Sequence, residues 1–194
     1  MKLKDIIKLS AGLMGLEDVV SVLDGKSDET EYTTSVIDRL TVLANMVMNE
    51  LSSTYIPLER TDEVKVVNKK ISMTALQKRP IKIINVTDVS SKDLDFTYDH
   101  ATIYVDSSNA KVTYNYVAEN YKLTDDVGFT EQNISKVVLA YGTCAEYCLT
   151  QRRFEEAIMW HERFIDGVKQ RIEPEEAPVY IAPKNVNMPA RRWE

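Results

Sequence analysis

The stretch that decides the fold reads VKVVNKKISM at residues 64–73 and continues with IKIINV at 81–86, TIYV at 102–105 and VTYNYV at 112–117. Apolar, β-branched and aromatic residues recur there at roughly two-residue steps, which is the pattern of short strands. Turn-forming residues separate the segments, at Asn68-Lys69, Asp88 to Lys92, Asp99-His100 and Ser107 to Ala110. We expect an inserted β-rich element at residues 60–120, folded as an antiparallel meander of about five or six short strands.

Helical spacing replaces strand spacing on the N-terminal side of this element. Apolar residues recur at three- and four-residue steps over residues 3–23 and again over residues 36–51. Gly12 and Gly15 weaken the middle of the first helix and favour a bend or a break there. We therefore expect residues 1–56 to form an N-terminal helical hairpin.

Capping residues predict where two helices begin. Asp28 followed by Glu31 predicts the start of the second helix, because a side-chain oxygen and an acid three residues on satisfy free amide hydrogens. Thr130 is expected to cap the third helix. Residues 128–172 then form a C-terminal helical hairpin that completes a bundle of about four helices.

The last helix carries one narrow apolar seam after a short break at residues 151–153. The members of this seam alternate steps of four and three residues, and they are Phe154, Ile158, His161, Ile165, Val168 and Ile172. A seam of this kind packs against another helix. We expect its partner to be the preceding helix.

Residues 173–194 are expected to form an extended, proline-rich arm. Four of the six prolines lie there, and the periodicity disappears. At about 3.3 Å per residue, an arm of this length reaches roughly 70 Å. Apolar residues that disordered tails usually lack are expected to dock on a partner, and they are Val179, Tyr180, Ile181, Met188 and Trp193.

Composition excludes several classes of protein. The 194 residues are 44% hydrophobic and 28% charged, as in ordinary globular domains. A net charge of −6 has the wrong sign for a chain that binds nucleic acid by neutralising phosphates. The sequence has neither an apolar run of about 20 residues nor the apolar block of a secretory signal, so we expect no membrane partner and a cytoplasmic site of synthesis.

A zinc site is the most specific chemistry that the sequence offers. Cys144 and Cys148 lie one helical turn apart and could bind zinc with His161 and His100. Both cysteines, however, belong to an apolar helix face, and free cysteine is among the most buried residue types. We therefore expect reduced core cysteines and no metal site.

Other reactive groups have a similar surface or packing explanation. The acids within residues 24–31 and 173–176 lack the spacing of a calcium loop and are expected to be solvated. No serine or cysteine motif accompanies a second histidine, and no glycine-rich phosphate loop occurs. We expect no catalytic residues and no cofactor. An enzyme with an unfamiliar carboxylate site is a third interpretation, after the two functions described below.

The order of elements resembles that of head-to-tail connector proteins, the adaptors or gatekeepers of tailed bacteriophages. The resemblance covers the whole chain as an order of elements, and its most specific stretch runs from VVLAYG at residues 137–142 to FEEA at residues 154–157. It predicts an α+β fold, with a helical bundle, an inserted antiparallel β meander and an extended C-terminal arm.

The resemblance implies a structural virion protein and not an enzyme. Copies would assemble as a ring, commonly of about twelve, below the portal protein, where they extend the DNA channel and form the platform for tail or neck proteins. DNA would pass without sequence-specific binding. The implied location is the neck region of the virion, after synthesis in the host cytoplasm.

A protein-binding module is the alternative interpretation. Residues 145–164 resemble one helical hairpin of a tetratricopeptide repeat. A solenoid needs at least about three such copies, and this sequence shows one. The hairpin could still bind a peptide in the cytoplasm.

Overall fold

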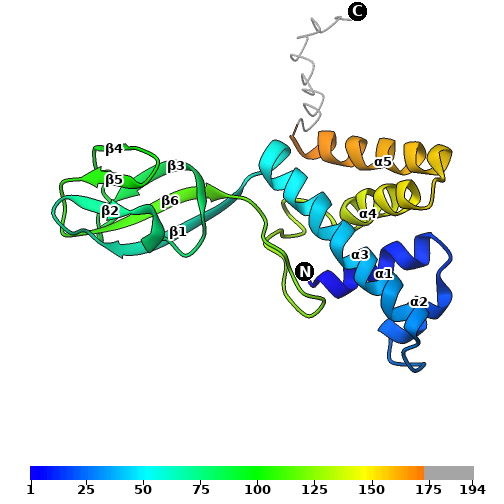
Figure 1. Ribbon diagram of the computed structural model, residues 1–194. Coiled ribbons are helices and arrows are strands. Elements are labelled where there is room, and N and C mark those ends of the chain that lie inside the picture. The colour runs from blue at the N-terminus through cyan, green and yellow to red at the C-terminus, as the bar shows by residue number, and fades with distance from the viewer. Residues whose placement is uncertain (173–194) are drawn as a thin grey trace, which may run out of the picture.

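The computed structural model describes residues 1–172 and has two parts, a helical body and a β module that projects from one end of it (Figure 1). The fold is mixed α+β, as predicted. Five helices form the body, and two small antiparallel sheets form the module.

The helical body is arranged around one central helix. Its helices are α1 (Leu3–Leu13), α2 (Glu17–Leu23), α3 (Glu31–Glu50), α4 (Lys136–Thr150) and α5 (Phe154–Ile172). α4 contacts α1, α3 and α5, while α5 lies on the outer side of the body (Figure 1). Gly15 has a φ of 70° and separates α1 from α2, so the predicted break falls at this glycine.

Two predicted helix starts are wrong by a few residues. α3 begins after Thr30 and not after Asp28. The Thr30 hydroxyl accepts from the Thr33 amide at 3.1 Å, and the Thr33 hydroxyl accepts from the Thr30 amide at 2.8 Å. α4 begins after Ser135, whereas Thr130 bonds within a short turn that precedes the helix. In both cases a hydroxyl closer to the first apolar turn provides the cap.

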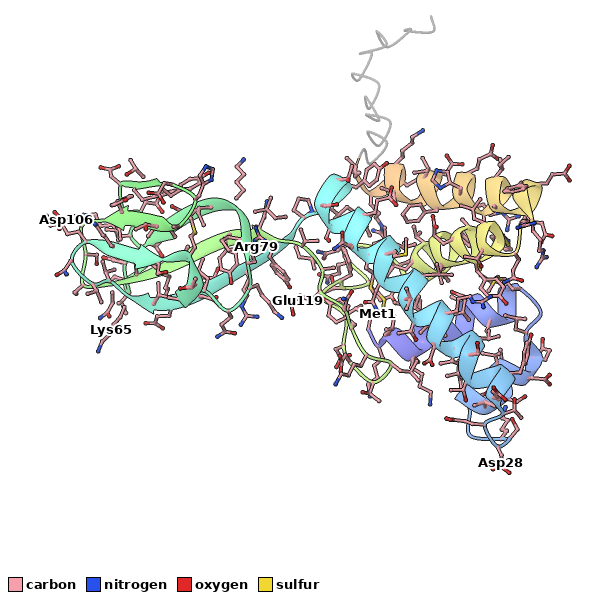
Figure 2. All side chains as sticks on the ribbon, in the orientation of Figure 1. Met1, Asp28, Lys65, Arg79, Asp106 and Glu119 are labelled. Carbon is pink, nitrogen blue, oxygen red and sulfur yellow. The ribbon has the colours of Figure 1, made fainter. Side chains whose placement is uncertain are left out.

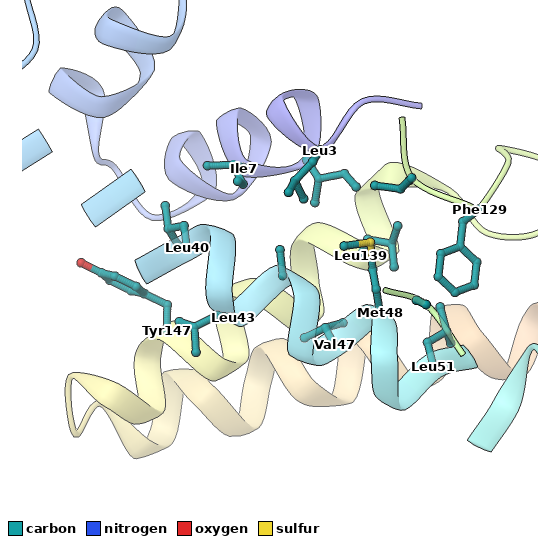
Figure 3. Close-up of a cluster of buried hydrophobic side chains, with 14 of the residues drawn as sticks. Leu3, Ile7, Leu40, Leu43, Val47, Met48, Leu51, Phe129, Leu139 and Tyr147 are labelled. Atoms are coloured by element: carbon teal, nitrogen blue, oxygen red, sulfur yellow. The ribbon is translucent and has the colours of Figure 1, made fainter. Parts of the chain in front are cut away.

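The core of the body is formed by α1, α3, α4 and the segment that leads into α4. Figure 3 shows Leu3 and Ile7 of α1 facing Leu40 and Met48 of α3, with Phe129 closing one end. These side chains are all buried. Burying each one stabilises the fold by about 1.5–3 kcal/mol.

Two glycines allow α4 to approach its neighbours closely. A Cβ on Gly142 would lie 2.7 Å from Cγ1 of Val47 on α3, and a Cβ on Gly167 would lie 2.5 Å from Cγ2 of Val138 on α4. Cβ atoms essentially never approach other atoms this closely. Glycine at these two points of contact therefore sets how closely α4 packs against α3 and α5.

The β module has six strands in two sheets. The strands are β1 (Leu58–Lys65), β2 (Lys70–Ser72), β3 (Pro80–Thr87), β4 (Phe96–Tyr98), β5 (Thr102–Val105) and β6 (Asn109–Tyr116), and a short 3-10 turn (Met73–Ala75) follows β2. The strand orders are β1-β6-β3 and β2-β5-β4. The predicted meander is therefore wrong, because the first strand of the module pairs with the last.

This pairing places the entry and the exit of the module side by side. β1 and β6 pair along their whole length, from Leu58 opposite Tyr116 to Lys65 opposite Asn109. The module has a hydrophobic cluster separate from that of the body, and Tyr114 is its largest fully buried side chain. It is a compact insertion on a two-stranded base.

The junction between the two parts is held by side chains of α3 and of the turn that follows. α3 passes into a π-helical turn (Leu51–Tyr55) before β1. The Asn45 side chain bonds both the amide and the carbonyl of Tyr121, at 2.8 and 2.9 Å, and the Ser52 hydroxyl accepts from the Ala118 amide at 2.8 Å. The chain that leaves β6 is therefore tied to α3.

Candidate interaction surfaces

The predicted seam of α5 does not pack as expected. α5 contacts α4 through a different set of buried residues, which are Ala157, Trp160, Phe164 and Val168. Of the seam, Val168 is buried and Ile165 is half-buried, but Phe154 and Ile158 are each 61% exposed and His161 is also exposed. The prediction that the preceding helix covers the whole seam is wrong.

Helical geometry explains the difference. Successive residues are about 100° apart around an α-helix, so the seam and the buried face lie side by side on α5 and share Val168. We define the α5 stripe as Phe154, Ile158, His161, Ile165 and Ile172. No other element among residues 1–172 covers the exposed part of this stripe. α5 thus has two apolar faces and one partner helix.

The orientation of α5 on α4 is fixed by aromatic contacts. Tyr141 and Trp160 stack with their ring centroids 5.5 Å apart, and the Arg163 guanidinium lies 5.0 Å from the Trp160 centroid. Trp160 is buried on the side of α5 that faces α4, whereas Arg163 is exposed at the edge of this contact. The contact between Tyr141 and Trp160 therefore opposes a rotation of α5 that would bury the α5 stripe against α4.

The cysteines are core residues, as predicted. Cys144 and Cys148 are free and fully buried between α1, α4 and α5. Burial raises the pKa of the Cys144 thiol to about 12. His100 lies in the β4–β5 turn of the module, and no metal-binding group of His, Cys, Asp and Glu side chains forms within residues 1–172.

A groove of about 860 Å³ runs beside α3, where Val42 and Met46 are exposed. Glu146 of α4 lines it together with Glu50. Burial, and then the nearby charge of Glu50, raises the pKa of Glu146, while the charge of His161 opposes the rise. The groove is a second uncovered surface of the body.

A further groove of about 700 Å³ lies at the base of the β module, and we call it the module groove. Figure 2 shows Arg79 at the end of the module nearest the helices, with Asp106 at the opposite tip. The lining of the module groove is apolar and basic. Its apolar residues are Met73, Leu76, Ile81, Ile83 and Tyr98, and its basic residues are Lys78, Arg79, Lys82 and His100. Sequence reasoning missed this surface. The available signal was charge, since residues 64–87 hold six Lys or Arg and no Asp or Glu.

The only acidic side chain that lines the module groove in the described chain is engaged elsewhere. The Asp99 carboxylate accepts from the amides of Ala101 and Thr102, both at 2.8 Å, and from the Tyr104 hydroxyl at 3.0 Å. The hydrogen bond from Ala101, followed by those from Tyr104 and Thr102, lowers the pKa of Asp99. The positive charges of the groove therefore have no free carboxylate among its lining residues.

A buried carboxylate fixes the rim of the module groove. Asp62 is 4% exposed and accepts from the Tyr114 hydroxyl at 2.6 Å, the Gln77 amide at 2.7 Å and Arg60 Nε at 2.7 Å. Burial favours a higher pKa for Asp62, but these hydrogen bonds outweigh it and lower the pKa. The Tyr114 hydroxyl also accepts from the Lys78 amide at 3.1 Å, so this network positions residues 77–78.

The docking residues predicted in the arm lie outside the described residues. They are Val179, Tyr180, Ile181, Met188 and Trp193. The arm begins after Ile172, which lines a hollow with Tyr55 and Pro57 at the start of the β module. The structure thus places Ile172, the last described residue, beside the start of the module.

Comparisons with known proteins do not identify the chain. A scan against protein-family models gives no match, and a search of curated proteins gives none either. Within residues 1–172, none of the helices has the length and apolar character needed to span a bilayer.

Proposed function

We propose that this protein is a head-to-tail connector of a tailed bacteriophage, which assembles as a ring below the portal, extends the DNA channel and carries the tail. In this proposal the surfaces of the protein, and not a reactive centre, perform the function. The partners are further copies of the chain, the portal protein and tail or neck proteins.

The observation that carries the proposal is the α5 stripe. Its apolar residues follow the spacing of a helix–helix seam, yet Phe154 and Ile158 are exposed. Exposed apolar side chains one turn apart on a helix, such as Phe154 and Ile158, are typical of a site of protein association. A helix of a neighbouring copy would complete the seam.

The two-part shape provides a second contact. The β module projects from the end of the body, so its surface and the α5 stripe are different patches of the same chain (Figure 1). Contacts between two different patches are heterologous, and they close into a ring when the rotation between copies allows it. The net charge of −6, repeated around such a ring, would repel DNA from the channel wall.

The proposal is tested by measuring the mass of the assembled protein. The full chain and the double variant Phe154→Ser/Ile158→Ser are each examined by native mass spectrometry, alone and with the portal protein. We expect the unmodified chain to form rings, at least in the mixture with the portal protein. We expect the variant to remain as single copies. Because both residues are exposed, the melting temperature of the variant should change by about 2 °C or less.

A matched control replaces two exposed valines of the module, Val67→Ser and Val89→Ser. This control should assemble as the unmodified chain does. Normal rings from the α5 variant would exclude the stripe as a contact. A chain that stays a single copy with and without portal would exclude the connector and favour the peptide-binding module.

The arm is tested separately by truncation after Glu173. All buried core residues of the two parts lie within the residues retained, so the truncated chain should fold. We expect it to fail to join heads that contain portal. Normal completion of infectious particles by the truncated chain would refute a role of the arm in assembly.

A further inference from the structure

We infer that the module groove is the docking site of the first part of the chain's own arm, residues 173–181. This segment reads EPEEAPVYI, with three acidic residues followed by three apolar ones. The inference concerns single copies of the chain and does not depend on ring assembly.

The position of the groove matches the origin of the arm. Pro80, at the start of β3, pairs with Tyr116 of β6, which also pairs with Leu58 at the start of β1. Two strand spacings of about 4.8 Å therefore separate the entry of the module from the groove. Ile172 lies beside Pro57, one residue before that entry. An extended segment of nine residues reaches about 30 Å, which is ample for this path.

Charge complementarity supports the same occupant. Arg79 and Lys82 line the groove, are exposed, and have no acidic partner among residues 1–172, while Lys78 at the rim contacts Glu119. Glu173, Glu175 and Glu176 would meet this basic end of the groove first, because they lie closest to Ile172. Screening at physiological salt leaves such contacts effective over about 8 Å.

The apolar residues of the segment match the rest of the lining. Ile81 is exposed on β3, and Tyr98 is exposed at the end of β4. β3 and β4 are edge strands of their two sheets, and the start of β3 borders the groove with a free edge in the described chain. An extended segment can pair with such an edge and place alternate side chains on the apolar floor. Val179, Tyr180 and Ile181 are β-formers suited to this mode.

The experiment uses disulfide formation in the full chain. Ala182→Cys lies next to the apolar residues of the segment and leaves them intact, and it is combined with Ile81→Cys in the groove. The control combines Ala182→Cys with Glu59→Cys. Glu59 lies in the same row of the sheet as Lys82, at the other edge, and β1 directly follows Pro57, which lines a hollow together with Ile172.

A segment docked in the groove and an arm that is only tethered predict opposite preferences of the cysteine at position 182 for the cysteines at positions 81 and 59. If the segment docks, the disulfide to position 81 forms within one chain about tenfold faster than the disulfide to position 59. If the arm is merely tethered, position 59 reacts at least as fast, and the inference fails. Disulfides formed mainly between copies would also overturn it, because the occupant would then be the arm of another copy.

Charge reversal provides the second test. Arg79→Glu with Lys82→Glu should remove the preference for position 81, whereas Lys65→Glu with Lys92→Glu, on exposed residues outside the groove lining, should leave it unchanged. Persistence of the preference after reversal at Arg79 and Lys82 would show that these charges do not recognise the segment. The buried thiols of Cys144 and Cys148 do not compete in this assay.

Discussion

At the scale of single residues, the buried network of Asp62 shows how the module combines stability with a defined surface. Three donors converge on one carboxylate, and one of them, the Gln77 amide, belongs to the loop that forms the groove rim. Burial of an unpaired charge is costly, so the network must be complete to be stabilising. Removing the carboxylate charge should therefore loosen both the module core and the loop.

Asp62→Asn should lower the free energy of unfolding by about 2–4 kcal/mol at pH 7. The pKa of Asp62 lies below its ordinary value of 3.8 in the folded chain. Its stabilisation is therefore full above pH 3.8 and is lost as the pH falls through the lower folded pKa. Urea unfolding followed by circular dichroism from pH 2 to pH 7 measures this. The difference between variant and unmodified chain should shrink below pH 3.8, while the exposed control Glu63→Gln stays within about 0.5 kcal/mol throughout.

Glu146 should have the opposite pH dependence. Its pKa lies above the ordinary value of 4.5 in the folded chain, so the ionised form opposes folding. Stability associated with this group is present below pH 4.5 and is lost as the pH rises through the raised folded pKa. Glu146→Gln should therefore raise the melting temperature by about 1–3 °C at pH 7 and leave it unchanged at pH 4. Glu162→Gln, on an exposed face of α5, is the control, and an equal rise in both variants would contradict the assignment.

At the scale of elements, the separation of the helices depends on glycine. Gly142→Ala should destabilise the body by about 1–3 kcal/mol, because its Cβ would lie 2.7 Å from Val47. Gly12→Ala in α1 is the matched control, since the nearest atom to its Cβ is 4.0 Å away. This control should gain about 0.5–1 kcal/mol from helix propensity. Thermal unfolding of the two variants should shift in opposite directions, and a shift of the same sign would disprove the packing argument.

Most elements could be predicted from the sequence because their apolar spacing is local information. The helix break at Gly15 and the turn at Asn68-Lys69 follow from backbone conformations that few residues adopt. The strand-like spacing quoted above starts at Val64, whereas β1 starts at Leu58, because the charged stretch LERTDE does not resemble a strand. Its partner β6 lies some fifty residues away, and pairing over that distance leaves no periodic trace.

The candidate surfaces were harder to predict for a physical reason. The periodicity of α5 shows which residues share a face, and it correctly groups Phe154 with Ile158. It does not show which of two adjacent apolar faces the single available partner covers. Trp160 and Phe164 are buried in the contact with α4, while Phe154 and Ile158 stay exposed. The module groove depends on residues brought together from separate segments, and only its charge was visible in the sequence.

At the scale of the whole molecule, the separate cores indicate that the body can fold without the module. Glu59 pairs with Asn115, so a two-residue Asn-Gly turn can join them in place of residues 60–114. We expect this shortened chain to keep its helical circular dichroism and one cooperative transition, within about 5 °C of the melting temperature of the body in the full chain.

Loss of helical signal in the shortened chain would show that the two parts fold as one unit. The matched comparison deletes residues 66–69, which removes the β1–β2 turn together with Val66, a residue that packs against the core of the module. That deletion should destabilise the module and leave the transition of the body in place. The two variants together assign each transition to one part.

The burial of the two cysteines makes their alkylation a measure of local opening of the helical body. Cys144 and Cys148 are sealed between three helices, and the Cys144 thiol does not ionise at neutral pH. An alkylating reagent in the solvent can reach them only while the helices are parted. The rate at which iodoacetamide alkylates these sulfur atoms therefore reports the population of the open state of the body. A subunit locked by its neighbours should be marked more slowly than a solitary one.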